Sequence, residues 1–288
     1  MGAVDNIINN MLVDKIKKLE QLLDSDIFQY YGPLDDGLVQ PFIAIMDSLT
    51  ECDNKRNKLS IILTTMGGSA YAVERMVRVI RHHYDNVAFY VPESAYSAGT
   101  IFCMSGDSIH MTYGSSLGPI DPQVKNKDGR YVPALGYLDK INELIDKAQA
   151  NQLSEAEFLI LKDIDLAEIR TYEQAKDYTV EILKKWLAKY KFRTWIEHKS
   201  SGKAVTQKEK VERAEEIARQ LGDNNLWLSH ARPIGIEQLR ELKLIIADYG
   251  EDKAIKSALG EFYQLSLDYI IKNGARICMQ TRTGGVLS

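Results

Sequence analysis

The chain has 288 residues, of which 45% are hydrophobic and 26% are charged, with 7 Pro and 19 Gly. This composition excludes collagen-like, low-complexity and disordered chains, and the length exceeds the usual domain size of about 100 to 200 residues. We therefore expect one large domain with an appendage, or two unequal domains. The net charge of -4 gives no general attraction for phosphate backbones, so nucleic acid is not an expected partner.

The cysteines and the apolar runs indicate the compartment. Cys52, Cys103 and Cys278 are odd in number and far apart, which excludes a disulfide framework or a metal knuckle and favours a reducing compartment. Polar residues interrupt the N-terminal segment before it reaches the apolar length of a signal peptide, and no window approaches the roughly 20 apolar residues of a membrane helix. We expect a soluble, cytoplasmic protein with no membrane span.

The first 112 residues alternate between helical and β-rich patterns. The helical spacing predicts helices over 11–24, 39–49, 70–84 and 97–105. The short apolar runs predict strands over 27–31, 58–65, 87–91 and 108–112. This alternation predicts an α/β layer with mostly parallel strands, in which ligands bind at the carboxyl ends of the strands.

The remainder of the chain is mainly helical. Amphipathic stretches predict helices over 138–150, 153–190, 207–221 and 253–272. The polar segment 193–205 is a candidate linker. The last eight residues, TRTGGVLS, are expected to form a frayed tail.

Two turns follow neighbouring strands and contain candidate catalytic residues. In LTTMGGSAY, Gly67 and Gly68 follow a buried strand and can leave backbone N–H groups free to hold an oxyanion. In VPESAYSAGT, small residues surround Ser97. The N–H groups that follow it, beginning with that of Ala98, open a helix and would add oxyanion donors near the same point. Each motif alone is also explained by a tight turn or by a helix start with small residues.

The order of three motifs carries a family resemblance. The runs LTTMGGSAYAVERMVRVIR, VPESAYSAGTIFCMSGDSIHM and GSSLGPIDPQ resemble the Clp-fold serine peptidases, which include the Clp protease proteolytic subunit and the signal peptide peptidase A class. The resemblance is greater to the serine dehydrogenase proteinase group of this fold. It covers 61–137 strongly and continues weakly to about residue 248.

The resemblance implies an α/β fold, a ClpP/crotonase-like spiral of ββα units with an extended helical region. Residues 1–192 are expected to form the catalytic core with a helical insertion. Residues 193–288 are then a C-terminal helical region, whose first part, about 224–248, closes the core. Ser97 matches the nucleophile, Gly67 and Gly68 match the oxyanion glycines, and active members of the family are homo-oligomers.

The base that Ser97 needs is the open part of the prediction. The Clp proteolytic subunit supplies a histidine shortly after the third strand, but Asp121 and Gln123 stand at that place, which argues against the usual order of a Ser-His-Asp triad. The signal peptide peptidase class uses a lysine, and Lys140 lies 43 residues after Ser97. His230, in WLSHARPI, is the other candidate.

Each candidate base has a purely structural alternative. Lys140 also fits an exposed helix charge beside Asp139 and Glu143, and His230 fits a histidine that stabilises the turn before Gly235.

The sequence thus predicts a serine peptidase that cleaves peptide or protein substrates through Ser97, with Lys140 or His230 as base. No cofactor or metal is expected, because phosphate-loop, nicotinamide and zinc motifs are missing from the sequence. The alternatives are an inactive Clp-fold scaffold that binds a peptide or a partner, and a crotonase-like acyl-CoA enzyme.

Overall fold

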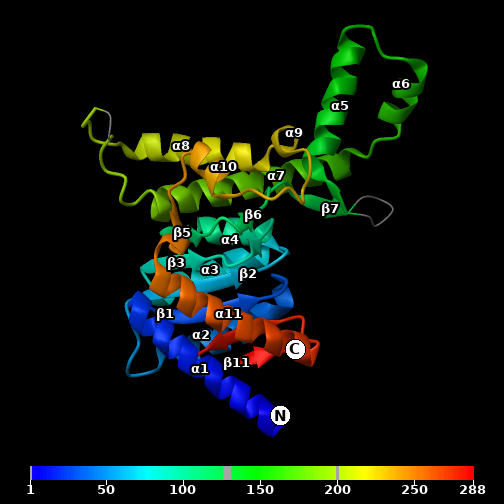
Figure 1. Ribbon diagram of the computed structural model, residues 1–288. Helices are drawn as coiled ribbons and strands as arrows, with labels where there is room; N and C mark the ends of the chain where they lie inside the picture. Colours follow the sequence, from blue (N-terminus) through cyan, green and yellow to red (C-terminus); the bar gives the residue numbers. More distant parts are fainter. Residues whose placement is uncertain (1, 126–130, 199–200) are drawn as a thin grey trace.

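The computed structural model describes residues 2–125, 131–198 and 201–288. Within these ranges the main sheet has seven strands in the order β11-β10-β1-β2-β3-β5-β9 (Figure 1). The parallel strands are β1 (Asp26–Tyr31), β2 (Lys58–Thr64), β3 (Asn86–Tyr90), β5 (Ser108–Met111) and β9 (Ile246–Asp248). The antiparallel strands are β10 (Cys278–Thr281) and β11 (Gly284–Leu287). The predicted α/β sheet with mostly parallel pairing is confirmed.

Helices cover both faces of this sheet (Figure 1). One face carries α1 (Ala3–Leu23) and α11 (Lys253–Asn273), whose apolar residues pack together over β1, β2 and β3. The other face carries α2 (Val39–Thr50), α3 (Ala70–His83) and α4 (Ala98–Met104), which belong to the larger core cluster. The strands are nearly continuous apolar runs because both of their faces are buried.

A second, thin layer of β-structure forms where the chain leaves the main strands. It contains β4 (Ser94–Ala95) paired in parallel with β6 (Ser116–Leu117). Single bridges extend it, from Leu34 to Gly68, from Thr65 to Ala95 and from Leu117 to Ile234. Each successive strand and its continuation into this layer, followed by a helix, form the ββα units of the expected spiral.

A helical layer lies above α4 (Figure 1). It contains α7 (Leu166–Trp186), with its π-helical end Leu187–Lys191, α8 (Gln207–Gly222), α9 (Asn224–Trp227) and α10 (Ile236–Glu241). Beside it, α5 (Ala134–Gln149) and α6 (Glu155–Lys162) form a hairpin that projects from the body. A short antiparallel pair, β7 (Gln123–Lys125) and β8 (Tyr131–Pro133), precedes α5.

The predicted helix over 153–190 is divided into two. Ser154 caps the start of α6 and Asp165 caps the start of α7, each by accepting a backbone N–H. The apolar periodicity continues across the break, which is why it suggested one helix. The domain boundary at 192/193 stays a prediction, and α7 and α8 pack against each other across it.

The expectation of a frayed C-terminal tail is wrong. Residues of that tail form the end of β10 and all of β11, which extend the main sheet beside β1. Arg282, in the turn between them, is 4% exposed and is paired with Glu20 and Asp26 at 2.6 Å each. A buried arginine needs such partners, so the ion pairs anchor the hairpin.

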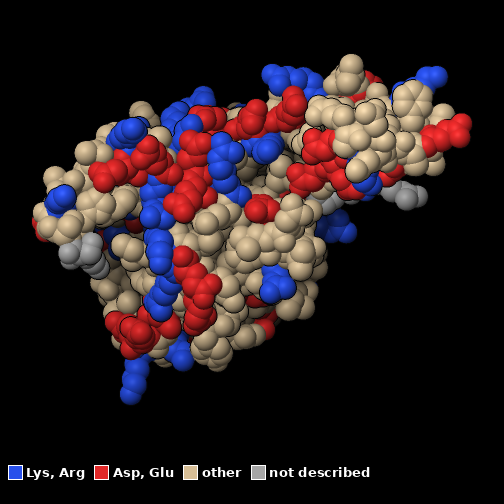
Figure 2. Space-filling view, turned by 90° about the horizontal axis from the view of Figure 1, so that it is seen from above, with Lys and Arg blue, Asp and Glu red and all other residues tan. Residues whose placement is uncertain are grey.

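Figure 2 shows acidic and basic side chains interspersed over the helical layer. Within the described ranges, no helix is both long enough and apolar enough to cross a membrane.

Candidate active site

The turn after β2 brings two glycines beside the turn that precedes α4. Gly67 and Gly68 have φ values of 107° and 148°, which residues with a side chain rarely adopt. A Cβ on Gly67 would lie 2.9 Å from the Cβ of Ser97, and one on Gly68 would lie 2.4 Å from the carbonyl oxygen of Leu34. Glycine is therefore required at both places for the two turns to approach each other.

Ser97 has a strained backbone at the start of α4, with φ 51° and ψ -116°. Such a conformation costs on the order of 1–3 kcal/mol and persists only where the surroundings enforce it. Here the N–H of Tyr96 donates to the carbonyl oxygen of Thr65 at 3.0 Å, and the N–H of Gly99 donates to that of Tyr96 at 2.8 Å. A sharp, strained turn before a helix is a common way to present a nucleophilic hydroxyl.

Two backbone N–H groups beside Ser97 are free. Those of Gly68 and Ala98 have no hydrogen-bond partner among the described residues, and both residues line the cavity that Ser97 also lines. The N–H of Gly67 donates instead to Oγ1 of Thr65 at 3.0 Å. Of the three predicted oxyanion residues, Gly68 and Ala98 thus keep an available donor, whereas Gly67 provides the space for Ser97.

His230 lines the same cavity as Ser97. Its Nδ1 lies 2.8 Å from Oδ1 of Asp121, whose side chain is 1% exposed. The side-chain amide of Gln123 donates to the other carboxylate oxygen at 2.9 Å. In the tautomer that carries its proton on Nδ1, the ring donates to Asp121, and Nε2 keeps a lone pair that can take a proton.

Backbone pairing brings His230 to Asp121 although the two are 109 residues apart. Leu117 and Ile234 exchange two hydrogen bonds of 2.9 and 2.8 Å. The N–H of Ile120 also donates to the carbonyl oxygen of Leu221, at the end of α8. The segment between α9 and α10 is thereby fixed against the loop between β6 and β7, which carries Asp121.

Lys140 lies elsewhere. Its side chain on α5 is 61% exposed, its Nζ is 2.8 Å from Oε2 of Glu143, and it does not line the cavity of Ser97. A lysine that acts as a base must be desolvated. The structure gives Lys140 the surface position of the alternative interpretation and does not bring it together with Ser97.

The shared cavity, called the catalytic cavity below, measures about 460 Å³. Apolar side chains of Met66, Ile101 and Ile120 contribute to its wall, together with Tyr71 and Tyr178, whose rings stack at 4.5 Å. It is therefore large enough for part of a peptide, and apolar and aromatic side chains form much of its wall, as is usual for binding sites.

Asp121 is the residue that sequence reasoning missed. It stood in GPIDPQ at the place where a histidine was sought, and a carboxylate there argued against a triad in the usual order. A carboxylate next to a nucleophile turn, in a chain with a candidate histidine further on, was the available signal. Asp121 contacts His230, which lines the cavity of Ser97, and the chain order Ser97, Asp121, His230 differs from Ser-His-Asp, as the order of triad residues differs between unrelated folds.

Solved structures to which the fold of this chain is similar include a variant of the 1510-N membrane-bound stomatin-specific protease. Its TM-score is 0.45 at 17% identity, and the match covers 77% of this chain and 79% of that chain. ClpP1 from Listeria monocytogenes has a TM-score of 0.43 at 9% identity, with 80% and 95% covered.

Two curated proteins from Methanocaldococcus jannaschii, the uncharacterized proteins MJ1495 and MJ0137, are each 27% identical to this chain. The matches extend over 184 and 212 residues, or 64% and 72% of this chain. They cover only 50% and 61% of the two relatives, so the chain spans about half to three fifths of their length.

Residues 42–254 match the family described as ClpP-like SDH-type serine proteinase. This range is well over half of the chain and includes both turns and the His230 segment. The protein therefore belongs to the ClpP-like SDH-type serine proteinases.

Proposed function

We propose that this protein is a serine peptidase in which Ser97 is the nucleophile, His230 the base and Asp121 the residue that orients the histidine. The observation that carries the proposal is the 2.8 Å contact between buried Asp121 and His230, which lines the same cavity as Ser97. A positioned histidine with a free Nε2 suits general-base catalysis at neutral pH.

The chemistry follows from these positions. Oγ of Ser97 attacks the carbonyl carbon of a peptide bond while its proton passes to Nε2 of His230. The free N–H groups of Gly68 and Ala98 stabilise the negative oxygen of the tetrahedral intermediate. His230 then protonates the leaving amine and afterwards activates the water that hydrolyses the acyl-enzyme, while Asp121 remains ionised throughout.

A fluorophosphonate probe tests the nucleophile directly. We expect labelling of Ser97, detected by peptide mass spectrometry, and no labelling of Ser97→Ala. His230→Ala should slow labelling by on the order of 100- to 10,000-fold, the usual contribution of a positioned base. Lys140→Met, which removes an exposed helix charge, should label within about twofold of the parent protein.

Two outcomes would contradict this proposal. If the folded protein is not labelled and cleaves no peptide, the Clp-fold scaffold that binds without cleaving becomes the better account. If Lys140→Met is as slow as His230→Ala, the lysine base returns in place of the histidine.

We also propose that the protein is a homo-oligomer. The projecting hairpin exposes Phe158, Leu159 and Ile160 on α6 by 55–61% each, and adjacent exposed apolar side chains of this size often mark an interface. Light scattering should give a mass above the 32.6 kDa of one chain. Phe158→Glu together with Ile160→Glu should lower that mass, and a monomeric parent protein would refute the proposal.

A further inference from the structure

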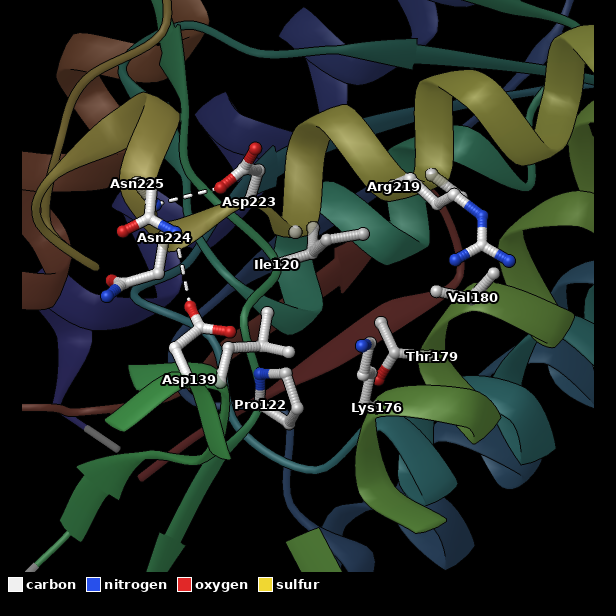
Figure 3. Close-up of a pocket in the computed structure, with 13 residues that line it drawn as sticks. Ile120, Pro122, Asp139, Lys176, Thr179, Val180, Arg219, Asp223, Asn224 and Asn225 are labelled. Atoms are coloured by element: carbon white, nitrogen blue, oxygen red, sulfur yellow. Dashed lines mark hydrogen bonds between the residues drawn. The ribbon is translucent and has the colours of Figure 1, made fainter. Parts of the chain in front are cut away.

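A second cavity adjoins the catalytic cavity. It measures about 280 Å³ and lies among α5, α7, α8 and α9 (Figure 3). We call it the helical cavity. Ile120, Pro122 and Thr179 line both cavities, so the helical cavity is the direct neighbour of the cavity that Ser97 lines.

Most charged groups that line the helical cavity already have partners. The guanidinium of Arg219 donates to Glu215 at 2.6 and 3.1 Å. Oδ1 of Asp223 accepts the backbone N–H of Asn225 at 2.8 Å, and Oδ2 of Asp139 accepts the side-chain amide of the same Asn225 at 3.1 Å (Figure 3). These groups therefore fix the helix ends around the cavity.

Lys176 differs from them. Its side chain is half-buried on α7, one turn before Thr179 on the shared wall. It makes no hydrogen bond or ion pair with any residue that the structure describes, and it lies across the cavity from Asp139 (Figure 3). An ammonium group that has lost part of its water and makes no ion pair with the described residues is a natural partner of a carboxylate.

The catalytic cavity offers no such cation. Its lining includes the exposed carboxylate of Asp35 and neither lysine nor arginine, whereas the helical cavity contains Lys176 beside the carboxylates of Asp139 and Asp223, which accept hydrogen bonds from Asn225. Lys176 is therefore the lysine among the lining residues of these two cavities that can pair with an acidic side chain of a bound peptide.

We infer that the helical cavity is a substrate subsite for an acidic side chain, glutamate or aspartate, with Lys176 as its counter-charge and specificity-determining residue. This inference rests on the proposed peptidase function. It deepens that proposal by naming the substrate class, namely peptides with an acidic residue near the cleaved bond.

Internally quenched peptides test the preference. Glu and Gln are compared at each position around the cleaved bond, and at one position we expect Glu to raise kcat/KM by on the order of tenfold, as one charge-assisted hydrogen bond would. Lys176→Met should abolish that difference, and Lys176→Glu should favour Lys over Glu at the same position. Lys185→Met, an exposed lysine on the same helix, is the matched control and should retain the Glu preference.

The result separates the inference from the proposed function. Cleavage without a Glu preference, or a preference that survives Lys176→Met, overturns the subsite while the peptidase stands. If nothing is cleaved, the proposed function fails, and binding of fluorescein-labelled Glu and Gln peptide libraries to Ser97→Ala decides the subsite. Tighter binding of the Glu library than of the Gln library supports the subsite if the difference is lost when Lys176→Met is added. Equal binding of the two libraries overturns it.

Discussion

Replacing Asp121 by asparagine tests the catalytic arrangement with the smallest change of shape. In the parent protein one carboxylate oxygen faces Nδ1 of His230 at 2.8 Å and the other accepts from Gln123 at 2.9 Å. Asparagine offers one acceptor oxygen and an NH₂ group, which only donates, in the same space. Two donors then compete for a single acceptor, and one of the two contacts is lost.

The expected losses differ between activity and stability. If the amide nitrogen that Asp121→Asn introduces faces His230, Nδ1 must accept a hydrogen bond and the ring proton moves to Nε2, where it blocks transfer from Ser97. We expect kcat to fall by on the order of 10³- to 10⁴-fold, or about 4–5 kcal/mol of transition-state stabilisation. One unsatisfied donor at a buried site should lower the free energy of unfolding by about 1–3 kcal/mol.

The assay is single-turnover labelling of Ser97 together with steady-state cleavage of a quenched peptide. The double variant Asp121→Asn with His230→Ala should be no slower than His230→Ala alone, because Asp121 acts through the histidine. Asp177→Asn, an exposed carboxylate on α7, is the matched control. The reasoning is refuted if folded Asp121→Asn retains more than about a tenth of the parent rate. It is also refuted if the rate loss of the double variant equals the product of the losses of Asp121→Asn and His230→Ala.

Three other changes have defined outcomes. Gly68→Ala would place a Cβ 2.4 Å from a backbone oxygen, which displaces an oxyanion donor, so peptide cleavage should fall by on the order of 100-fold; near-normal cleavage would remove Gly68 from the site. Burial lowers the pKa of His110 from 6.5 to about 4, so the folded state binds fewer protons between these values. Stability should therefore fall by about 3 kcal/mol as the pH falls from about 6.5 to 4. Urea titrations at pH 7 and 4.5 measure this loss of stability. The prediction is refuted if a folded His110→Phe variant loses as much stability between these pH values as the parent protein does. Arg282→Met leaves buried Glu20 and Asp26 without their cation and should cost about 3–5 kcal/mol in the free energy of unfolding; a loss below about 1 kcal/mol by urea denaturation would show that the hairpin is not anchored by these pairs.

The core of the fold was predictable because its signals are local. The apolar runs of β2 and β3, followed by small residues, specify buried strands and tight turns within a few residues of sequence. The C-terminal hairpin was not predictable in this way. TRTGGVLS has little apolar content of its own, and its order depends on pairing with β1 and on the contacts of Arg282 with residues more than 250 positions away.

The candidate site likewise contains features that the sequence predicted and features that it did not. The nucleophile turn and the glycine turn were visible as motifs, since each places its own backbone. The partner of His230 was not visible, because the bridge from Leu117 to Ile234 and the packing of α7 and α8 bring Asp121 to it across the helical insertion. Lys140 had a suggestive spacing along the chain, but the direction of α5 carries it to the surface.

The sequence by itself therefore determined the α/β class, the family resemblance and the two turns that meet at Ser97. Local chemistry is sufficient for these features, because a buried strand that ends in glycine or small residues has few conformations available. Only the tertiary structure decided which candidate base shares a cavity with Ser97, which nearby N–H groups have no partner among the described residues, and that Lys176 forms no ion pair with them. Those properties depend on contacts between residues that are distant in the chain, and sequence spacing alone does not encode them.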